Sequence, residues 1–300
     1  MKKALLQLHA AVFLAGFTGI LGRLIKLNEG LLVWYRMLIT VVILLLILVP
    51  QKKLIKISTR DKFKLFAVGT IVALHWVTFY GSIKYANVSI ALVCFSSIGF
   101  FTAFFEPLIL KRKFDSVEVL LGCLAMIGIY LIFNFNPGYK TGIIIGIISA
   151  LLAVLFSIIN KRLVSRLPVK TITFYELSGG WLVLTILMPV YLDIFPTPYI
   201  FPSWYDWLWL FLLAGVCTVW AFNLQLNALT KVSTFTSNLT YNLEPVYGII
   251  LAFIVFKENK YLSDGFYTGL ALIIAAVILQ TVRITTQKDR NLVLTKENSG

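Results

Sequence analysis

The chain alternates long apolar stretches with short polar segments from one end to the other. A helix that rises 1.5 Å per residue needs about 20 apolar residues to cross a bilayer core of roughly 30 Å. The pattern therefore predicts an all-α membrane protein with ten transmembrane helices. The ten predicted spans are residues 5–24, 30–49, 66–83, 88–110, 117–134, 142–161, 171–191, 206–227, 234–256 and 265–284.

Composition agrees with this pattern. Of the 300 residues, 59% are hydrophobic and only 13% are charged, whereas a soluble domain carries about 25% charged residues. The first span follows Lys2 and Lys3 without a small-residue cleavage site, so we interpret it as a helix and not a signal peptide. The three cysteines lie within spans and form no metal-ligand spacing, so we expect no metal and no cofactor.

The positive charges give the chain an orientation. With the N-terminus inside, twenty lysines and arginines lie on cytoplasmic segments and six on outer segments. This excess follows the positive-inside rule and predicts a multi-pass protein of the inner (cytoplasmic) membrane with both termini cytoplasmic. The net charge of +14 is then explained by topology and by attraction to lipid head groups, and we expect no nucleic-acid partner.

The two halves of the chain resemble each other. VWYRML at 33–38 aligns with TFYELS at 173–178, and FDSVEVLLG at 114–122 aligns with YLSDGFYTG at 261–269. Each half holds five predicted spans, and an odd number places the second half upside down relative to the first. We therefore predict two inverted five-helix repeats, residues 1–138 and 139–285, followed by a cytoplasmic polar tail at 286–300.

The repeats, the loop KENKYLS at 257–263 and the segment NLEPVYG at 242–248 resemble the EamA-type branch of the drug/metabolite transporter superfamily. The resemblance covers about residues 5–135 and 142–284. It implies ten helices, alternating access around a central cavity, and export or exchange of small metabolites such as amino acids. Many members of the family have a proline in the fourth helix where this chain has Ile98, with Gly99 next to it.

Ionisable residues inside hydrocarbon are costly and mark functional sites. Glu244 lies about 15 Å into the ninth span and His75 is at a similar depth in the third. Each lies on a stripe of polar and small residues at helical spacing, which faces protein or water and not lipid. We expect Pro245 to bend the ninth span and free the carbonyl of Tyr241. The same two residues are also compatible with hydrogen-bonded ties between helices.

Further residues are candidates to line a central cavity, although interhelical bonding or core packing is the alternative for each. Together with Glu244 and His75, the substrate-binding candidates are Tyr241, Phe79, Ser97, Asn242, Trp76, Trp220, Asn223 and Phe17.

Three other charged residues lie nearer the ends of their spans. Arg36 is interpreted as a structural cation that reaches the outer surface or a helix carbonyl. Glu176 is expected to pair with a basic residue such as Lys161 or Arg162, and Glu106 with the basic loop that follows it. The sequence leaves open whether these three are structural or functional.

The chain contains no P-loop, HExxH or GxSxG motif, which argues against an ATP-driven pump and against an enzyme. The leading hypothesis is a secondary transporter that exports small neutral or zwitterionic metabolites, such as amino acids, by alternating access. Proton coupling through Glu244 is part of this hypothesis.

The alternatives are a channel-like facilitator and an intramembrane enzyme that uses His75 and Glu244. The expected partners are a small-molecule substrate and the lipid bilayer, and the oligomeric state is open, a monomer included.

Overall fold

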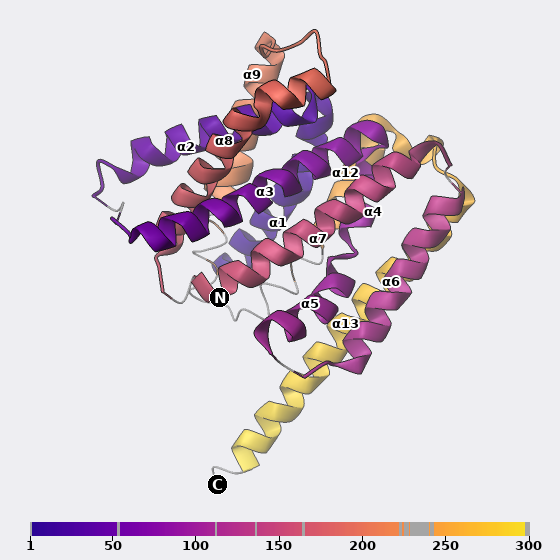
Figure 1. Ribbon diagram of the computed structural model, residues 1–300. Coiled ribbons are helices and arrows are strands. Elements are labelled where there is room, and N and C mark those ends of the chain that lie inside the picture. Colours follow the sequence, from indigo (N-terminus) through magenta and orange to yellow (C-terminus); the bar gives the residue numbers. More distant parts are fainter. Residues whose placement is uncertain are drawn as a thin grey trace.

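The computed structural model describes residues 2–52, 55–111, 113–135, 137–163, 166–221, 224, 228, 240 and 243–297 (Figure 1). Across these residues it is a helical bundle without strands. The elements are α1 (Lys2–Leu24), α2 (Glu29–Leu48), α3 (Thr59–Tyr85), α4 (Val88–Phe95), α5 (Ile98–Leu110), α6 (Ser116–Phe135), the 3-10 turn η1 (Pro137–Tyr139), α7 (Lys140–Leu163), α8 (Val169–Ile194), α9 (Trp204–Phe211), the π-helix η2 (Leu212–Trp220), α12 (Glu244–Phe256), the 3-10 turn η3 (Glu258–Lys260) and α13 (Asp264–Glu297).

Within the described residues, eight helical segments are long and apolar enough to cross a membrane. They match eight of the ten predicted spans, so the prediction of an all-helical membrane protein is confirmed. The other two predicted spans hold shorter apolar helices, Trp204–Trp220 and Glu244–Phe256. Parts of those two spans, at 222–227 and 234–242, fall largely outside the described residues, so the count of ten remains a prediction.

Helix starts follow from local capping chemistry. The side chain of Asn28 accepts a hydrogen bond from the backbone N–H of Leu31, and Asn87 does the same for Ile90. Ser203 forms a capping box with Asp206 at the start of α9. These side chains satisfy N–H groups that have no partner inside the helix.

The helix α3 is central to the bundle because it packs along both α7 and α8 (Figure 1). Other close pairs include α6 with α13 and α1 with α12. Small residues allow these approaches: a Cβ atom added at Gly128 of α6 would lie 2.6 Å from the carbonyl oxygen of Gly269 in α13. Close backbone contact of this kind is typical of helices that associate inside a membrane.

Two helices are interrupted within the bundle. The span at 88–110 breaks at Ser96 and Ser97, between α4 and α5. The predicted bend of the ninth span is instead a helix start: α12 begins at Glu244, with Pro245 in its first turn. Proline is well suited to this position because its missing N–H would have no helical partner there. Tyr241, whose carbonyl the bend was expected to free, lies outside the described residues.

The last helix is longer than the sequence predicts. Residues 286–297, expected as a polar tail, continue α13 as far as Glu297. This part of α13 extends beyond the rest of the bundle (Figure 1). The tail is therefore helical up to that residue.

Candidate functional site

A buried arginine lies where α2, α3 and η2 meet. Arg36 is only 5% exposed. Its Nη1 donates to the hydroxyl of Tyr80 at 2.6 Å, and its Nε and Nη2 donate to Thr218 Oγ1 at 3.3 and 3.1 Å. The guanidinium lies 3.7 Å from the ring centroid of Trp76, within the range of a cation–π contact. We call Arg36, Trp76, Tyr80 and Thr218 the arginine cluster.

The environment of Arg36 differs from the sequence-based expectation. Its side chain does not reach the surface, and it bonds hydroxyl oxygens and an aromatic face instead of a carbonyl. Among the described side chains no carboxylate forms an ion pair with it. Thr218 belongs to the π-helix η2, and such irregular turns are frequent at functional sites.

Tyr80 connects the arginine cluster to the rest of the bundle. It is fully buried, and its ring packs against Gly22 of α1, where an added Cβ would lie 2.2 Å from the ring. Its hydroxyl accepts the hydrogen bond from Arg36 Nη1 of α2. Tyr80 of α3 therefore contacts both α1 and α2.

Glu244 is the first residue of α12 and is partly buried. No described residue donates a hydrogen bond to its carboxylate. Its backbone carbonyl lies against Gly16 of α1, where an added Cβ would lie 2.9 Å from the oxygen. The N-terminus of a helix favours negative charge through its free N–H groups and dipole. The structure thus places a carboxylate near the centre of the bundle without a fixed cationic partner among the described residues.

His75 belongs to a different cluster on the side of α3 that faces α7. Its Nδ1 lies 2.9 Å from Ser149 Oγ and 3.0 Å from the Ser149 carbonyl, and Ser149 Oγ donates to the carbonyl of His75 at 3.0 Å. The rings of Phe79, Phe95 and Phe156 surround the imidazole at centroid distances of 6.3, 5.5 and 5.6 Å. We call these residues the histidine cluster. No described contact joins His75 to Glu244.

The remaining predicted site residues have different surroundings. Ser97 is buried and donates to the carbonyl of Cys94 at 2.6 Å, which satisfies the end of α4. Phe17 stacks on Phe13 at 6.4 Å. Trp220 is 53% exposed and lines an open groove between α1 and α12, and does not lie in the interior. Tyr241, Asn242 and Asn223 lie outside the described residues.

Glu176 is buried in α8 and accepts a hydrogen bond from Asn160 Nδ2 at 3.2 Å. Its Oε1 atom and Asn160 Oδ1 have no hydrogen-bond partner among the described residues. Lys161 and Arg162, the partners expected from the sequence, have side chains outside the described set. Glu106 precedes Pro107 inside α5, which ends at Leu110 as the sequence suggests.

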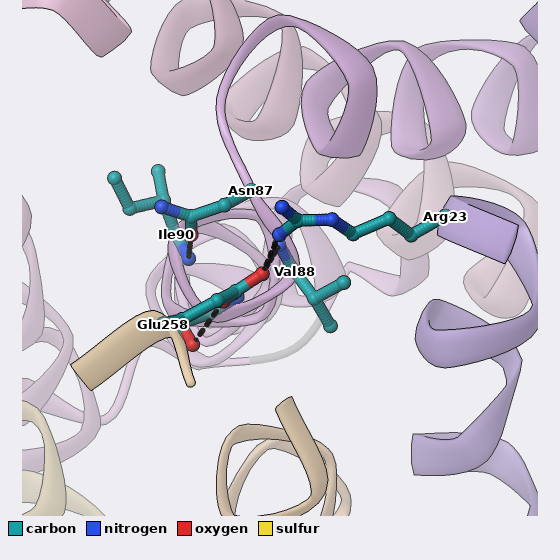
Figure 2. A network of polar contacts seen from close by, with 6 residues as sticks. Arg23, Asn87, Val88, Ile90 and Glu258 are labelled. Atoms are coloured by element: carbon teal, nitrogen blue, oxygen red, sulfur yellow. Dashed lines mark hydrogen bonds and ion pairs between the residues drawn. The ribbon is translucent and has the colours of Figure 1, made fainter. Parts of the chain in front are cut away.

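At one end of the bundle, opposite the N-terminus, a buried carboxylate ties three segments together. Glu258, 2% exposed, accepts hydrogen bonds from the backbone N–H groups of Val88 at 3.0 Å and Ser89 at 2.8 Å. It also forms an ion pair with Arg23 (Figure 2). The loop after α12 is thereby fixed to the N-terminus of α4 and the end of α1, a favourable position for an anion.

The loop between α1 and α2 is fixed at the same end. Lys84 Nζ donates to the carbonyls of Ile25, at 3.1 Å, and Leu27. Asp206 of α9 accepts from the backbone N–H of Lys26 at 2.8 Å, and Tyr191 of α8 donates to Glu29 at 2.7 Å. These bonds join the ends of five helices above the arginine cluster.

Comparison with known proteins identifies the family. The sequence model of the EamA-like transporter family matches residues 2–134 and 140–281. The chain belongs to the EamA-like transporter family.

Two relatives show how far this EamA-like transporter resembles proteins already described. It is 23% identical over 296 residues to the "Uncharacterized transporter YetK" of Bacillus subtilis (strain 168), which covers 93% of this chain and 87% of that protein. A solved crystal structure superposes with a TM-score of 0.61 at 15% identity, covering 94% of this chain and 98% of the other. At that identity the likeness concerns the fold alone.

Sequence reasoning found only part of the arginine cluster. Trp76 is one of the predicted site residues, whereas Arg36 is interpreted as structural and no pattern singles out Thr218. The available signals were an arginine inside a span and the i, i+4 spacing of Trp76 and Tyr80, which puts both rings on one helix face. The position of Thr218 depends on how η2 packs against α2, which no local pattern reveals.

Proposed function

We propose that this EamA-like transporter exports small neutral or zwitterionic metabolites, such as amino acids and related compounds, across the cytoplasmic membrane by alternating access. The observation that carries the proposal is Glu244, a carboxylate at the start of α12 that no described residue neutralises. Such a group in the middle of a membrane bundle is suited to bind a cationic group or a proton.

Two inverted repeats, 1–138 and 139–285, are part of this proposal. The family sequence model matches two ranges that fall on either side of the proposed boundary. The helices α5 and α12 both have 13 residues, and each is followed by a lysine in the left-handed conformation, Lys111 and Lys257. Helix pairing also repeats, since α7 packs against α4 and α5 while α1 packs against α12. Related halves that exchange two packings are the usual basis of alternating access.

The proposed orientation places both termini in the cytoplasm. The end of the bundle tied by Glu258 and Lys84 is then the outer end, and the described network corresponds to an outward-closed arrangement. Export requires that these bonds break once per cycle. The discontinuity at Glu244 offers a hinge position between the two arrangements.

The experiment is transport in proteoliposomes. We expect a radiolabelled substrate to show counterflow, which separates a carrier from a channel-like facilitator, and to leave the vesicle chemically unchanged, which excludes the enzyme alternative. The search for the substrate starts from cellular resistance to toxic amino-acid analogues on overexpression. Absence of counterflow with every substrate found in this way would refute the carrier.

Proton coupling through Glu244 has its own test. An imposed pH gradient should increase the flux of wild-type protein and of Asp193→Asn, a control at an exposed carboxylate. Glu244→Gln should lose the gradient dependence while retaining exchange. If Glu244→Gln keeps normal gradient-driven flux, Glu244 is not the coupling group.

A further inference from the structure

Arg36 is a buried cation whose charge is not neutralised by the described part of the chain. Arginine remains protonated in proteins, and an isolated charge inside a membrane protein is costly unless an anion accompanies it. The sequence contains 13 acidic residues. Eleven of these have described side chains, and none of the eleven pairs with Arg36. The other two, Asp289 and Glu297, lie in the part of α13 beyond the bundle.

The hydrogen bonds of Arg36 leave part of its binding capacity free. A guanidinium has five N–H groups, and three of them donate to Tyr80 and Thr218. One N–H remains on each terminal nitrogen. Two neighbouring N–H groups of this kind bind a carboxylate through two parallel hydrogen bonds. The face of the guanidinium is fixed on Trp76, so the two free N–H groups are oriented before a ligand binds.

The space next to the arginine cluster leads towards the N-terminal side of the bundle. A small pocket of about 60 Å³ is lined by Thr40 and Thr218 and by the residues below them on α2 and α8, as far as Lys170. Thr218 bonds the guanidinium, and Thr40 donates to the carbonyl of Arg36 at 2.8 Å. At this size the pocket holds only a few water molecules. The opposite side is closed by the network around Glu258 and Lys84.

We propose that Arg36 binds the carboxylate of the transported molecule, so that the substrates are zwitterionic metabolites that carry a free carboxylate. The inference rests on the proposed function and gives it a substrate class. Tyr80 and Thr218 hold the guanidinium in position for such a ligand.

The first experiment measures binding without transport. Purified protein in detergent is heated with L-leucine, L-valine or L-phenylalanine, with their methyl esters, and with the corresponding decarboxylated amines. A ligand that binds only the folded state raises the melting temperature. At least one free acid should raise it by about 3 °C or more, whereas its ester and its amine should not. If no acid does so, or if the ester is as effective as the acid, the carboxylate assignment is overturned.

The variants separate binding from structure. Arg36→Gln should abolish the stabilisation by the acid, while without ligand its melting temperature equals or exceeds that of the wild type, because an unneutralised charge has been removed. Arg36→Lys keeps the positive charge but not the paired N–H groups, and it should weaken the apparent affinity for the acid at least tenfold. Arg60→Gln, at an exposed position of α3, is the matched control and should behave as wild type. A strong loss of stability in ligand-free Arg36→Gln contradicts the proposal and indicates a structural tie.

Other anions are distinguished in the same assay. Sodium phosphate and sodium chloride at the same ionic strength should leave the melting temperature unchanged. An increase equal to that produced by the acid would assign the site to an inorganic anion. The proteoliposome assay separates the two proposals. If methyl esters inhibit counterflow as strongly as the free acids do, the protein is a transporter but Arg36 does not bind the carboxylate. Acid-specific stabilisation without counterflow would retain the role of Arg36 and reject the transporter.

Discussion

The two clusters that adjoin α3 contain buried groups that can carry positive charge, yet they differ in how completely those groups are satisfied. In the histidine cluster, Ser149 bonds both the imidazole and the backbone of His75, and three phenylalanine rings surround it. In the arginine cluster, hydroxyl groups and an indole hold Arg36 in place without neutralising its charge. A polar group whose hydrogen bonds are satisfied stabilises the fold, whereas a buried charge without a counter-charge marks a position where a ligand can bind.

The largest effect that tests this comparison is on stability. Phe79 of the histidine cluster is 6% exposed, and Phe79→Ala should lower the free energy of unfolding by about 3 to 5 kcal/mol, the usual cost of an emptied aromatic site. The folded fraction should keep its apparent affinity for substrate. Thermal unfolding in detergent and counterflow measure the two quantities. Phe63→Ala, at a site of α3 that is 72% exposed, is the control, and a change in affinity with little loss of stability would reverse the assignment.

The next effect is on affinity. Trp76→Ala removes the ring beneath the guanidinium, and a desolvated cation–π contact contributes about 2 kcal/mol. We expect the apparent affinity for substrate to be roughly thirtyfold weaker in Trp76→Ala. Trp76→Phe keeps an aromatic ring and should retain most of the wild-type affinity. Counterflow at varied substrate concentration measures it, and Trp204→Ala, 84% exposed, is the control. Equal affinities in Trp76→Ala and wild type would remove Trp76 from the site.

A smaller effect is expected at η2. Thr218→Val keeps the side-chain shape but removes the oxygen that accepts two N–H groups of Arg36. A hydrogen bond to a charged group contributes about 1.5 kcal/mol or more, so the affinity should fall roughly tenfold. Thr218→Ser should recover it. Failure of serine to recover the affinity would mean that the methyl group, and not the hydroxyl, is what matters.

The smallest effect concerns an ion pair at the N-terminal end of the bundle, between Asp115 and Arg283. The Arg283 guanidinium lowers the pKa of Asp115, so this pair stabilises the folded state above the pKa of an unfolded aspartate, about 4. The contribution is lost as the pH falls through the lowered pKa. Because Asp115 is 39% exposed, solvent limits the contribution to at most about 1 kcal/mol.

The measurement is the melting temperature of Asp115→Asn and wild type. The wild type should be slightly more stable at pH 7, and the difference should shrink near pH 3 and in high salt. A difference that stays constant over this range would show that the pair acts through packing and not through charge.

The sequence by itself determined the membrane class, most of the helices and the family. Apolar runs of the length of a bilayer leave few alternatives, because unpaired backbone groups are excluded from hydrocarbon. It also selected Glu244, because a carboxylate in an apolar span is energetically costly whichever direction its helix face points. Spacing along the chain placed His75 and Phe79 on the stripe that was expected to face the cavity.

Only the tertiary structure decided which of these groups are satisfied. Periodicity puts a side chain on a helix face but does not say which neighbouring helix supplies its partner. Ser149 satisfies His75 from α7, whereas Arg36 meets hydroxyls and an indole from α3 and η2 and no carboxylate among the described residues. Hydrogen bonds depend on a few tenths of an ångström between helices, and that distance is set by packing. The same physical chemistry therefore makes one buried residue part of the fold and the other a candidate to bind substrate.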